Sequence, residues 1–132
     1  MNEKVEHFLL YELTDDWMPI GAFDAIISTV SPEAYSRMRV LEAIRELAER
    51  EFIRFGAFPG GGRTWEPWDV SLDEAIDRIA YGYNNVPGYL AVPYCEISSN
   101  EVFRADLLEK GERRLVELGN PYDRYGDPWK NV

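Results

Sequence analysis

The sequence has little histidine, cysteine or lysine: one histidine, one cysteine and three lysines in 132 residues. The lone Cys95 cannot form an internal disulfide, and one histidine with one cysteine is too small a set for zinc. Long apolar runs are also missing, because a run such as 8–11 falls far short of the roughly 20 residues that span a bilayer. The first residues carry acids where a signal peptide carries bases. We therefore expect a cytoplasmic protein without a membrane span, a metal or another cofactor.

Patterns typical of catalysis are absent as well. His7 is the only histidine, and no serine or cysteine signature stands near it to complete a nucleophilic arrangement. The run Gly60–Arg63 lacks the lysine and the Ser/Thr of a phosphate-binding loop, so it indicates a loop tip. We expect His7 to be a surface or helix-packing residue and Cys95 to be a buried or inert thiol. The sequence predicts a protein that is not an enzyme, and an enzyme with an unrecognised site stays as an alternative.

Negative charge dominates the composition. The chain has 24 Asp and Glu against 14 Lys and Arg, which gives a net charge of −10 and a pI of about 4.5. Phosphate backbones and anionic membranes attract basic surfaces, so this composition disfavours both as partners, although it allows a local basic patch. Eleven of the 14 basic residues are arginines, which pair with carboxylates better than lysines do. We expect these arginines to pair with neighbouring acids.

Apolar spacing predicts three helices in the first 50 residues. A short amphipathic helix is predicted over 3–13, with a strand over 7–13 as the competing prediction, and a second helix over about 17–28. Ser31-Pro32-Glu33 has the pattern of an N-cap, a first-turn proline and a first-turn acid, and it opens a long helix over 32–50. The predicted apolar face of that helix comprises Ala34, Met38, Leu41, Ile44, Leu47 and Ala48.

The middle of the chain alternates between strand and turn patterns around one more helix. A strand is predicted at 52–58, directly before the turn run 59–62. Ser71-Leu72-Asp73-Glu74 is a capping box, which opens a fourth helix. Residues 84–100 are expected to be extended and rich in loops, because their prolines argue against a central strand.

A strand at 101–107 and a closing helix at 110–118 complete the predicted elements, with Gly119 in the position of a helix-ending glycine. We expect one domain over 1–119, followed by a C-terminal tail over 120–132. The aromatic residues of this tail predict that it packs on the body or on a partner.

The order of these elements resembles that of a winged helix-turn-helix. Segment 101–115 is similar to the final wing strand and helix start of MarR- and PadR-type regulators, in which Leu-Thr leads into Lys-Gly-Arg and then leucine. The positions that match this pattern are Leu107, Lys110, Gly111 and Leu115. Leu108 stands in place of the threonine, and Glu112 follows the glycine.

Two other stretches, 13–20 and Trp68 with the capped helix from Ser71, resemble a group of uncharacterised actinobacterial winged-helix-like proteins. The resemblance implies an α+β fold with a winged helix-turn-helix-like core, a helix-containing insertion between the wing strands and a C-terminal helix. The insertion, 58–100, departs from an ordinary wing, which is a short hairpin. Because one fold hosts many functions, the resemblance implies architecture more than activity.

A DNA-reading helix at 32–50 would present its polar face to the major groove. That face holds Tyr35, Arg39, Glu42, Glu46, Glu49 and Arg50, three acids against two arginines. This charge opposes phosphate contacts, so a DNA-binding transcription regulator is the alternative hypothesis. Its candidate nucleic-acid contacts are Tyr35, Arg37, Arg39, Arg54, Arg63 and Arg104.

Aromatic residues favour a different function. Tyr and Trp are enriched in protein–protein contacts, although the same residues would also anchor a loop-rich insertion to a small core. The leading hypothesis is a non-catalytic protein-interaction module whose protein partner and pathway the sequence does not identify; a homodimer is compatible with it. The candidate interface comprises Trp65, Trp68, Tyr89, Tyr94, Tyr122, Tyr125 and Trp129.

Overall fold

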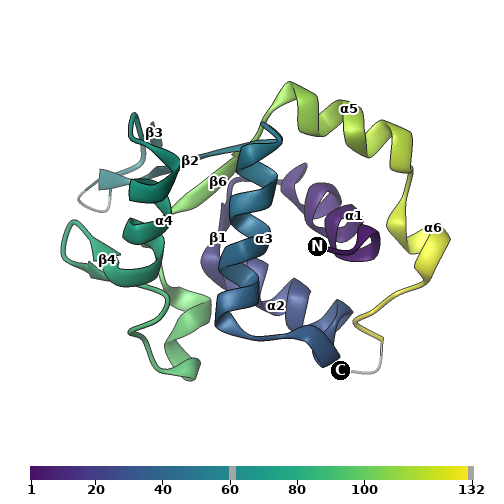
Figure 1. Cartoon of the computed structure of the whole chain (residues 1–132), viewed down its shortest axis with the longest axis horizontal. Helices are drawn as coiled ribbons and strands as arrows, with labels where there is room; N and C mark the ends of the chain where they lie inside the picture. The colour runs from purple at the N-terminus through teal and green to yellow at the C-terminus, as the bar shows by residue number, and fades with distance from the viewer. Residues whose placement is uncertain (60–61, 131–132) are drawn as a thin grey trace.

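The computed structural model describes residues 1–59 and 62–130, and these form a mixed α+β fold (Figure 1). The elements of the N-terminal half are α1 (Glu3–Leu13), β1 (Met18–Pro19), α2 (Ile20–Val30), the 3₁₀ turn η1 (Pro32–Ala34), α3 (Arg37–Glu49) and β2 (Ile53–Ala57). Those of the C-terminal half are β3 (Glu66–Pro67), α4 (Leu72–Tyr81), β4 (Gly82–Tyr83), β5 (Val86–Pro87), the 3₁₀ turn η3 (Tyr94–Ser99), β6 (Arg104–Leu107), α5 (Glu109–Leu118) and α6 (Pro121–Tyr125).

A small antiparallel sheet joins the two halves of the chain. Its strand order is β1-β6-β2-β3, so β6 lies between two strands that precede it by many residues. β2 and β6 pair from Ile53↔Leu107 to Gly56↔Arg104, and β1 pairs with β6 at Met18↔Ala105 and Pro19↔Arg104. β4 and β5 form a separate hairpin. The chain therefore leaves the sheet after β3 and returns to it in β6. We call residues 58–100, which include β3, the excursion.

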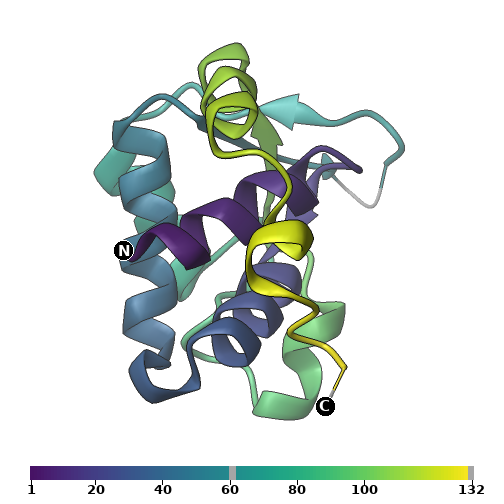
Figure 2. The same cartoon turned by 90° about the vertical axis from the view of Figure 1, so that its right-hand side faces the viewer.

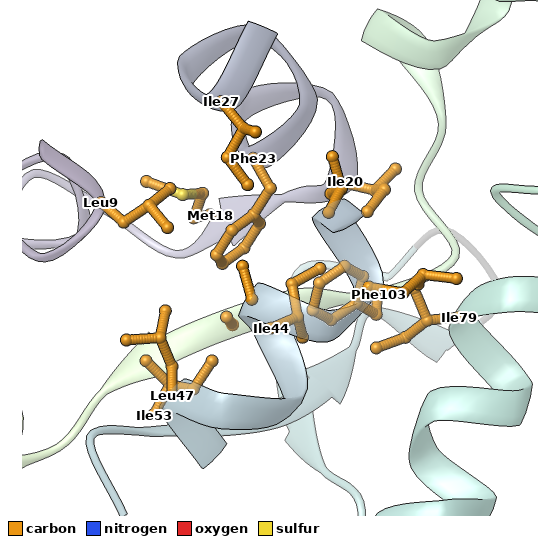
Figure 3. Packing of buried hydrophobic residues seen from close by; sticks show 14 of the residues in the cluster. Leu9, Met18, Ile20, Phe23, Ile27, Ile44, Leu47, Ile53, Ile79 and Phe103 are labelled. Atoms are coloured by element: carbon orange, nitrogen blue, oxygen red, sulfur yellow. The ribbon is translucent and has the colours of Figure 1, made fainter. Parts of the chain in front are cut away.

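The hydrophobic core lies where α1, α2 and α3 pack against this sheet (Figure 3). Phe103, which directly precedes β6, is at its centre: its ring lies 6.0 Å from that of Phe23 in α2 and 5.8 Å from that of Phe55 in β2, centroid to centroid. Ile79 of α4 is also fully buried, so the excursion contributes to the same core. Burial of each such side chain stabilises the fold by about 1.5–3 kcal/mol.

The helix predicted over 32–50 is divided in the structure. α3 begins only after Ser36, whose side chain caps it by accepting a hydrogen bond from a first-turn N–H, so the prediction that Ser31 caps this helix is wrong. The predicted apolar face is also wrong at Ala34, which is exposed in η1, and at Met38, which is exposed in α3, whereas Val40 is fully buried. Residues two positions apart in a helix are separated by roughly 200° around its axis, so the side chains of Met38 and Val40 point in nearly opposite directions.

The second predicted helix begins later than expected. Met18 and Pro19 belong to β1, and α2 starts at Ile20. Proline is tolerated in this short edge strand because its missing N–H is not needed by a neighbour. The side chain of Asp16 accepts a hydrogen bond from the N–H of Trp17 and does not cap the helix.

The remaining helix predictions are confirmed with small shifts. The first helix forms over the competing strand, α4 is capped by Ser71 through the N–H of Glu74, and α5 starts one residue before the predicted position. The strands at 52–58 and 101–107 are shorter than predicted, and β1, β3, β4, β5 and α6 were not predicted. The segment 84–100, expected to be extended and rich in loops, also contains η3. Of the expected loop tip, residues 60 and 61 lie outside the described part of the chain. Throughout that described part, every helix is too short or too polar to cross a membrane.

Two further expectations concern single residues. Cys95, expected to be buried or inert, is exposed on η3. His7 is fully buried in α1, and its Nε2 lies 2.7 Å from the carbonyl oxygen of Gly119. The tail passes beside this side of α1 (Figure 2). The ring of Tyr125 packs edge-on against His7, and that of Tyr122 packs against Phe8. These contacts place the tail on the body of the molecule.

Gly111 is the point of closest approach between α5 and the sheet. A Cβ atom at this position would lie 2.6 Å from the carbonyl oxygen of Phe52 and 2.7 Å from Cδ1 of Leu107. The Phe52 carbonyl cannot move freely, since it accepts a hydrogen bond from the N–H of Leu108. A glycine is therefore required where the chain turns from β6 into α5.

Gly111→Ala should lower the free energy of unfolding by about 1–3 kcal/mol, because the added methyl group forces the helix away from the strand. Urea denaturation followed by circular dichroism measures the change. Lys110→Ala, on the exposed neighbour, is the control and should change stability by about 0.5 kcal/mol or less. Equal losses in the two variants would contradict the close approach.

Candidate interaction site at an aromatic cleft

A cleft of about 990 Å³ opens between the sheet and the excursion. Its walls come from the turn before β1, the β2–β3 arm, the approach to α4, the β4–β5 hairpin and the segment before β6. We call it the aromatic cleft, after the side chains described below. The excursion elements that border it, β3, α4 and β4, lie together at the left of Figure 1.

One wall of the aromatic cleft is an arginine held between two rings. The guanidinium carbon of Arg78, on α4, lies 3.9 Å from the ring centroid of Tyr83 and 5.2 Å from that of Trp68. The two rings meet edge to face with their centroids 5.4 Å apart. Cation–π attraction of this kind contributes about 0.5–2 kcal/mol, so Arg78 holds both rings in a defined orientation.

On the other side, Trp17 and Phe58 line the cleft, and Trp65, which adjoins it, packs against Trp17. The Trp17 ring lies 5.6 Å from that of Phe58 and stacks 6.0 Å from that of Trp65. Trp65 donates a hydrogen bond from Nε1 to the carbonyl of Arg104, which ties the β2–β3 arm to β6. Gly56 allows this packing, since a Cβ atom there would lie 2.5 Å from the Trp65 ring.

The charged residues of the aromatic cleft are mostly acidic. Arg104 is bound by both carboxylate oxygens of Glu101, and this hydrogen bonding raises the pKa of Arg104 above its usual value. The remaining acids, Asp16, Glu66 and Asp69, are exposed and form no ion pair with any described residue. The cleft therefore combines fixed aromatic rings with an excess of negative charge, because four acids line it against Arg78 and Arg104.

A buried polar network fixes the excursion against the helices. Asp24 of α2 is buried and accepts hydrogen bonds from the hydroxyls of Tyr89 and Tyr35, the latter at 2.5 Å. Arg37, at the start of α3, donates to the carbonyls of Tyr89 and Val92 at 2.9 and 2.7 Å. Hydrogen bonds to charged groups contribute about 1.5–3 kcal/mol each. The network thus holds the chain that follows β5, and with it the hairpin that carries the cleft's tyrosine.

The predicted interface residues separate into three groups. Trp68 is half-buried and lines the aromatic cleft, Trp65 is half-buried beside it, and Tyr94 is exposed on η3 outside it. Tyr89 is fully buried in the core, so in this structure it cannot face a partner. The tail residues pack on the body: Tyr122 donates to Glu12, Tyr125 covers His7, and Trp129 contacts the core.

The predicted nucleic-acid contacts are largely occupied within the molecule. The hydroxyl of Tyr35 is bound to Asp24, and Arg37 is bound to two carbonyls. Arg39, Arg54 and Arg104 pair with Glu42, Asp106 and Glu101. Arg63 is exposed beside the undescribed residues of the loop. These pairings place acids beside the bases that a DNA surface would need.

Sequence reasoning missed several residues of the site. Trp17 and Phe58 come from segments that are distant in the sequence, and nothing local in either segment indicates that they meet. The acids Glu66 and Asp69 were equally hard to single out, because the chain contains 24 acids. As for metal ions, the residues that the structure describes bring no three His, Cys, Asp or Glu side chains into a group that could hold one.

Comparison of the chain with protein-family models, curated proteins and solved structures gives no match. The chemistry of the aromatic cleft is therefore the basis for a functional proposal. It offers aromatic area, fixed side chains and negative charge, and these properties suit binding.

The buried network makes the fold sensitive to high pH. Burial, together with the hydrogen bond to Asp24, raises the pKa of Tyr89 far above the ordinary value of about 10. Above about pH 10, the tyrosine of the unfolded chain loses its proton while Tyr89 in the folded chain keeps it. The free energy of unfolding therefore falls by up to about 1.4 kcal/mol per pH unit.

Tyr89→Phe should therefore show a shallower loss of stability above about pH 10 than the parent protein, although it is less stable at neutral pH. Urea denaturation at a series of pH values measures the slope. The exposed Tyr94→Phe is the matched control and should keep the parent slope. An unchanged slope in Tyr89→Phe would mean that another group causes the alkaline loss.

Proposed function

We propose that this chain is a non-catalytic protein-interaction module on a winged-helix-like scaffold, and that it contacts its partner through the aromatic cleft. The observation that carries the proposal is the set of preorganised rings. Trp17 and Tyr83 are 38% and 39% exposed although each is held by neighbouring side chains. Tyr, Trp and Arg dominate the binding energy of protein interfaces, and rings that are already oriented lose little entropy on binding.

The order of elements supports the scaffold part of the proposal. Three helices with β1 between the first two are followed by β2 and, after the excursion, by β6, which pairs with both. A winged helix-turn-helix is expected to have this order, with a short hairpin in place of the excursion. Here the region corresponding to the wing carries α4 and the aromatic cleft, which suits a contact with a protein better than with a DNA groove.

The environment of the histidine supports the non-catalytic part. His7 is fully buried, and its Nε2 is hydrogen-bonded to a backbone carbonyl, so it has no access to a substrate. Asp24, the most deeply buried carboxylate of the excursion network, is covered by two tyrosine hydroxyls. Both groups support the fold and are closed to external molecules.

Site-specific photocrosslinking tests this proposal. A photoreactive phenylalanine analogue in place of Tyr83, inside the aromatic cleft, should form covalent adducts with a protein in an extract of the source cells. The same analogue in place of Tyr81, which is 71% exposed and outside the cleft, is the matched control and should give little adduct. The captured protein, once purified, should bind the parent chain and bind Trp17→Ala more weakly.

Adducts at position 81 as abundant as those at position 83 would contradict the proposal, because they would indicate random encounters. If position 83 forms adducts with nucleic acid alone, the result would favour the alternative function of a DNA-binding regulator. Trp17→Ala must keep the parent circular dichroism spectrum, so that a weaker interaction reports on the cleft and not on the fold.

The order of helices also keeps DNA binding as a second candidate, and the charges oppose it. Fluorescence anisotropy with a labelled random duplex should show no binding at roughly 0.05 M salt, conditions that favour phosphate contacts. A regulator would bind there, lose affinity as salt rises, and lose it further in Arg39→Glu. The exposed Arg113→Glu on α5 makes the same change of charge outside α3 and serves as the control.

A further inference from the structure

We infer that the occupant of the aromatic cleft is an extended, positively charged segment of the partner protein, with arginine or lysine side chains facing the cleft. This inference rests on the proposed function and adds the chemistry of the partner. Four properties of the described residues carry it: the distribution of charge, the use of the rings, the open donors of Arg78 and a second cleft that continues the first.

Most basic side chains are already paired within the molecule, whereas many acids are not. Eight of the eleven arginines form ion pairs with acids of the same molecule: Arg39, Arg45, Arg50, Arg54, Arg78, Arg104, Arg114 and Arg124. Acids outnumber bases by ten, so many carboxylates have no cation to neutralise them. Asp16, Glu66 and Asp69 are three of these, and all face the aromatic cleft. A basic segment would neutralise them, whereas an acidic one would be repelled.

The rings that line or adjoin the aromatic cleft already bind guanidinium groups within the molecule. Beside the Arg78 contacts, the guanidinium carbon of Arg54 lies 4.9 Å from the Trp65 centroid and that of Arg104 lies 5.7 Å from the Phe58 centroid. Trp17 has no such internal cation among the described residues, and its ring is partly exposed. It therefore offers an aromatic surface that a cation from outside can use.

Arg78 favours a polypeptide over a simple cation. Its side chain is only 19% exposed, and its nearest carboxylate oxygen, on Glu74, is 3.9 Å away, beyond hydrogen-bonding distance. Across the described chain its N–H groups have no hydrogen-bond acceptor, although Arg78 lines the cleft. The backbone carbonyls of an extended segment would accept hydrogen bonds from these donors, which a simple cation cannot do.

A second cleft continues the first and favours an extended occupant. It has a volume of about 460 Å³, lies between the end of α1, α2 and the tail, and shares Asp16 and Trp17 with the aromatic cleft. Its lining adds two more acids, Glu12 and Asp15, and the ring of Trp129. A segment that leaves the aromatic cleft past Trp17 would therefore meet the same combination of acids and rings again.

Binding of three labelled peptides of equal length tests the inference at about 0.15 M salt. One alternates arginine with serine, the second replaces each arginine by glutamine, and the third by glutamate. Fluorescence anisotropy should show binding of the arginine peptide alone. Glu66→Lys should weaken it about three- to tenfold, because one attraction becomes a repulsion.

Two matched controls separate the cleft from the general charge of the chain. Glu112→Lys, on exposed α5, changes the net charge by the same amount as Glu66→Lys and should alter binding less than twofold. Tyr83→Ala should weaken binding about two- to tenfold through the lost ring, whereas Tyr81→Ala should not. Circular dichroism identifies any variant that fails to fold. If Glu66→Lys fails, Asp69→Lys, which changes another exposed acid of the cleft, replaces it.

Several outcomes would overturn the inference. Equal losses in Glu66→Lys and Glu112→Lys would mean that net charge alone attracts the peptide. Binding of the glutamate peptide would mean that Arg78 selects an acidic partner, and equally tight binding of free spermine would remove the requirement for a polypeptide. If no peptide binds while position 83 still crosslinks to a protein, the inference fails and the proposed function stands. If the arginine peptide binds and no protein is captured, the proposed function fails.

Discussion

The fold depends on one set of backbone pairings, those that place β6 between β1 and β2. Ile53 and Leu107 are partners in this sheet although the whole excursion separates them in the chain. The pairing buries Phe103 and Ala105 completely and brings the first residues of the excursion beside the last. Phe58 and Arg104 can meet across the aromatic cleft for this reason. The cleft is thus a consequence of how the excursion returns to the sheet, and the Asp24 network keeps its far end in place.

Local signals predicted most of the helices and the two longer strands, and they missed the strands of two residues. The capping serine Ser71 and the apolar spacing that follows it lie within one segment, so the sequence of that segment is enough to predict α4. β1 and β3 have only two residues each, and their pairing is decided by strands far away in the chain. The error at Met38 arose in another way. The predicted spacing ran from Ala34 to Met38 across the break that precedes α3, so it assigned Met38 and not Val40 to the buried face.

The candidate site was predicted only in part, because burial depends on distant partners. Trp68 and Tyr89 were both predicted as interface residues because they are aromatic. Trp68 lines the cleft, whereas Tyr89 is buried in the core. The difference comes from Asp24 on α2, whose buried carboxylate accepts a hydrogen bond from the hydroxyl of Tyr89. His7 is buried for a similar reason, since the tail covers it. The sequence around Asp24 and around the tail aromatics does not predict which residues they contact.

The internal use of the arginines also affects how fast this protein meets other molecules. Its cations are held at short range by carboxylates and rings, so the field that extends into solvent is set by the excess of ten negative charges. Such a field speeds the encounter with positively charged molecules and slows the approach of a second copy. It decays over about 8 Å at physiological ionic strength. Salt will therefore change the association rates of this protein more than the lifetimes of the complexes it forms.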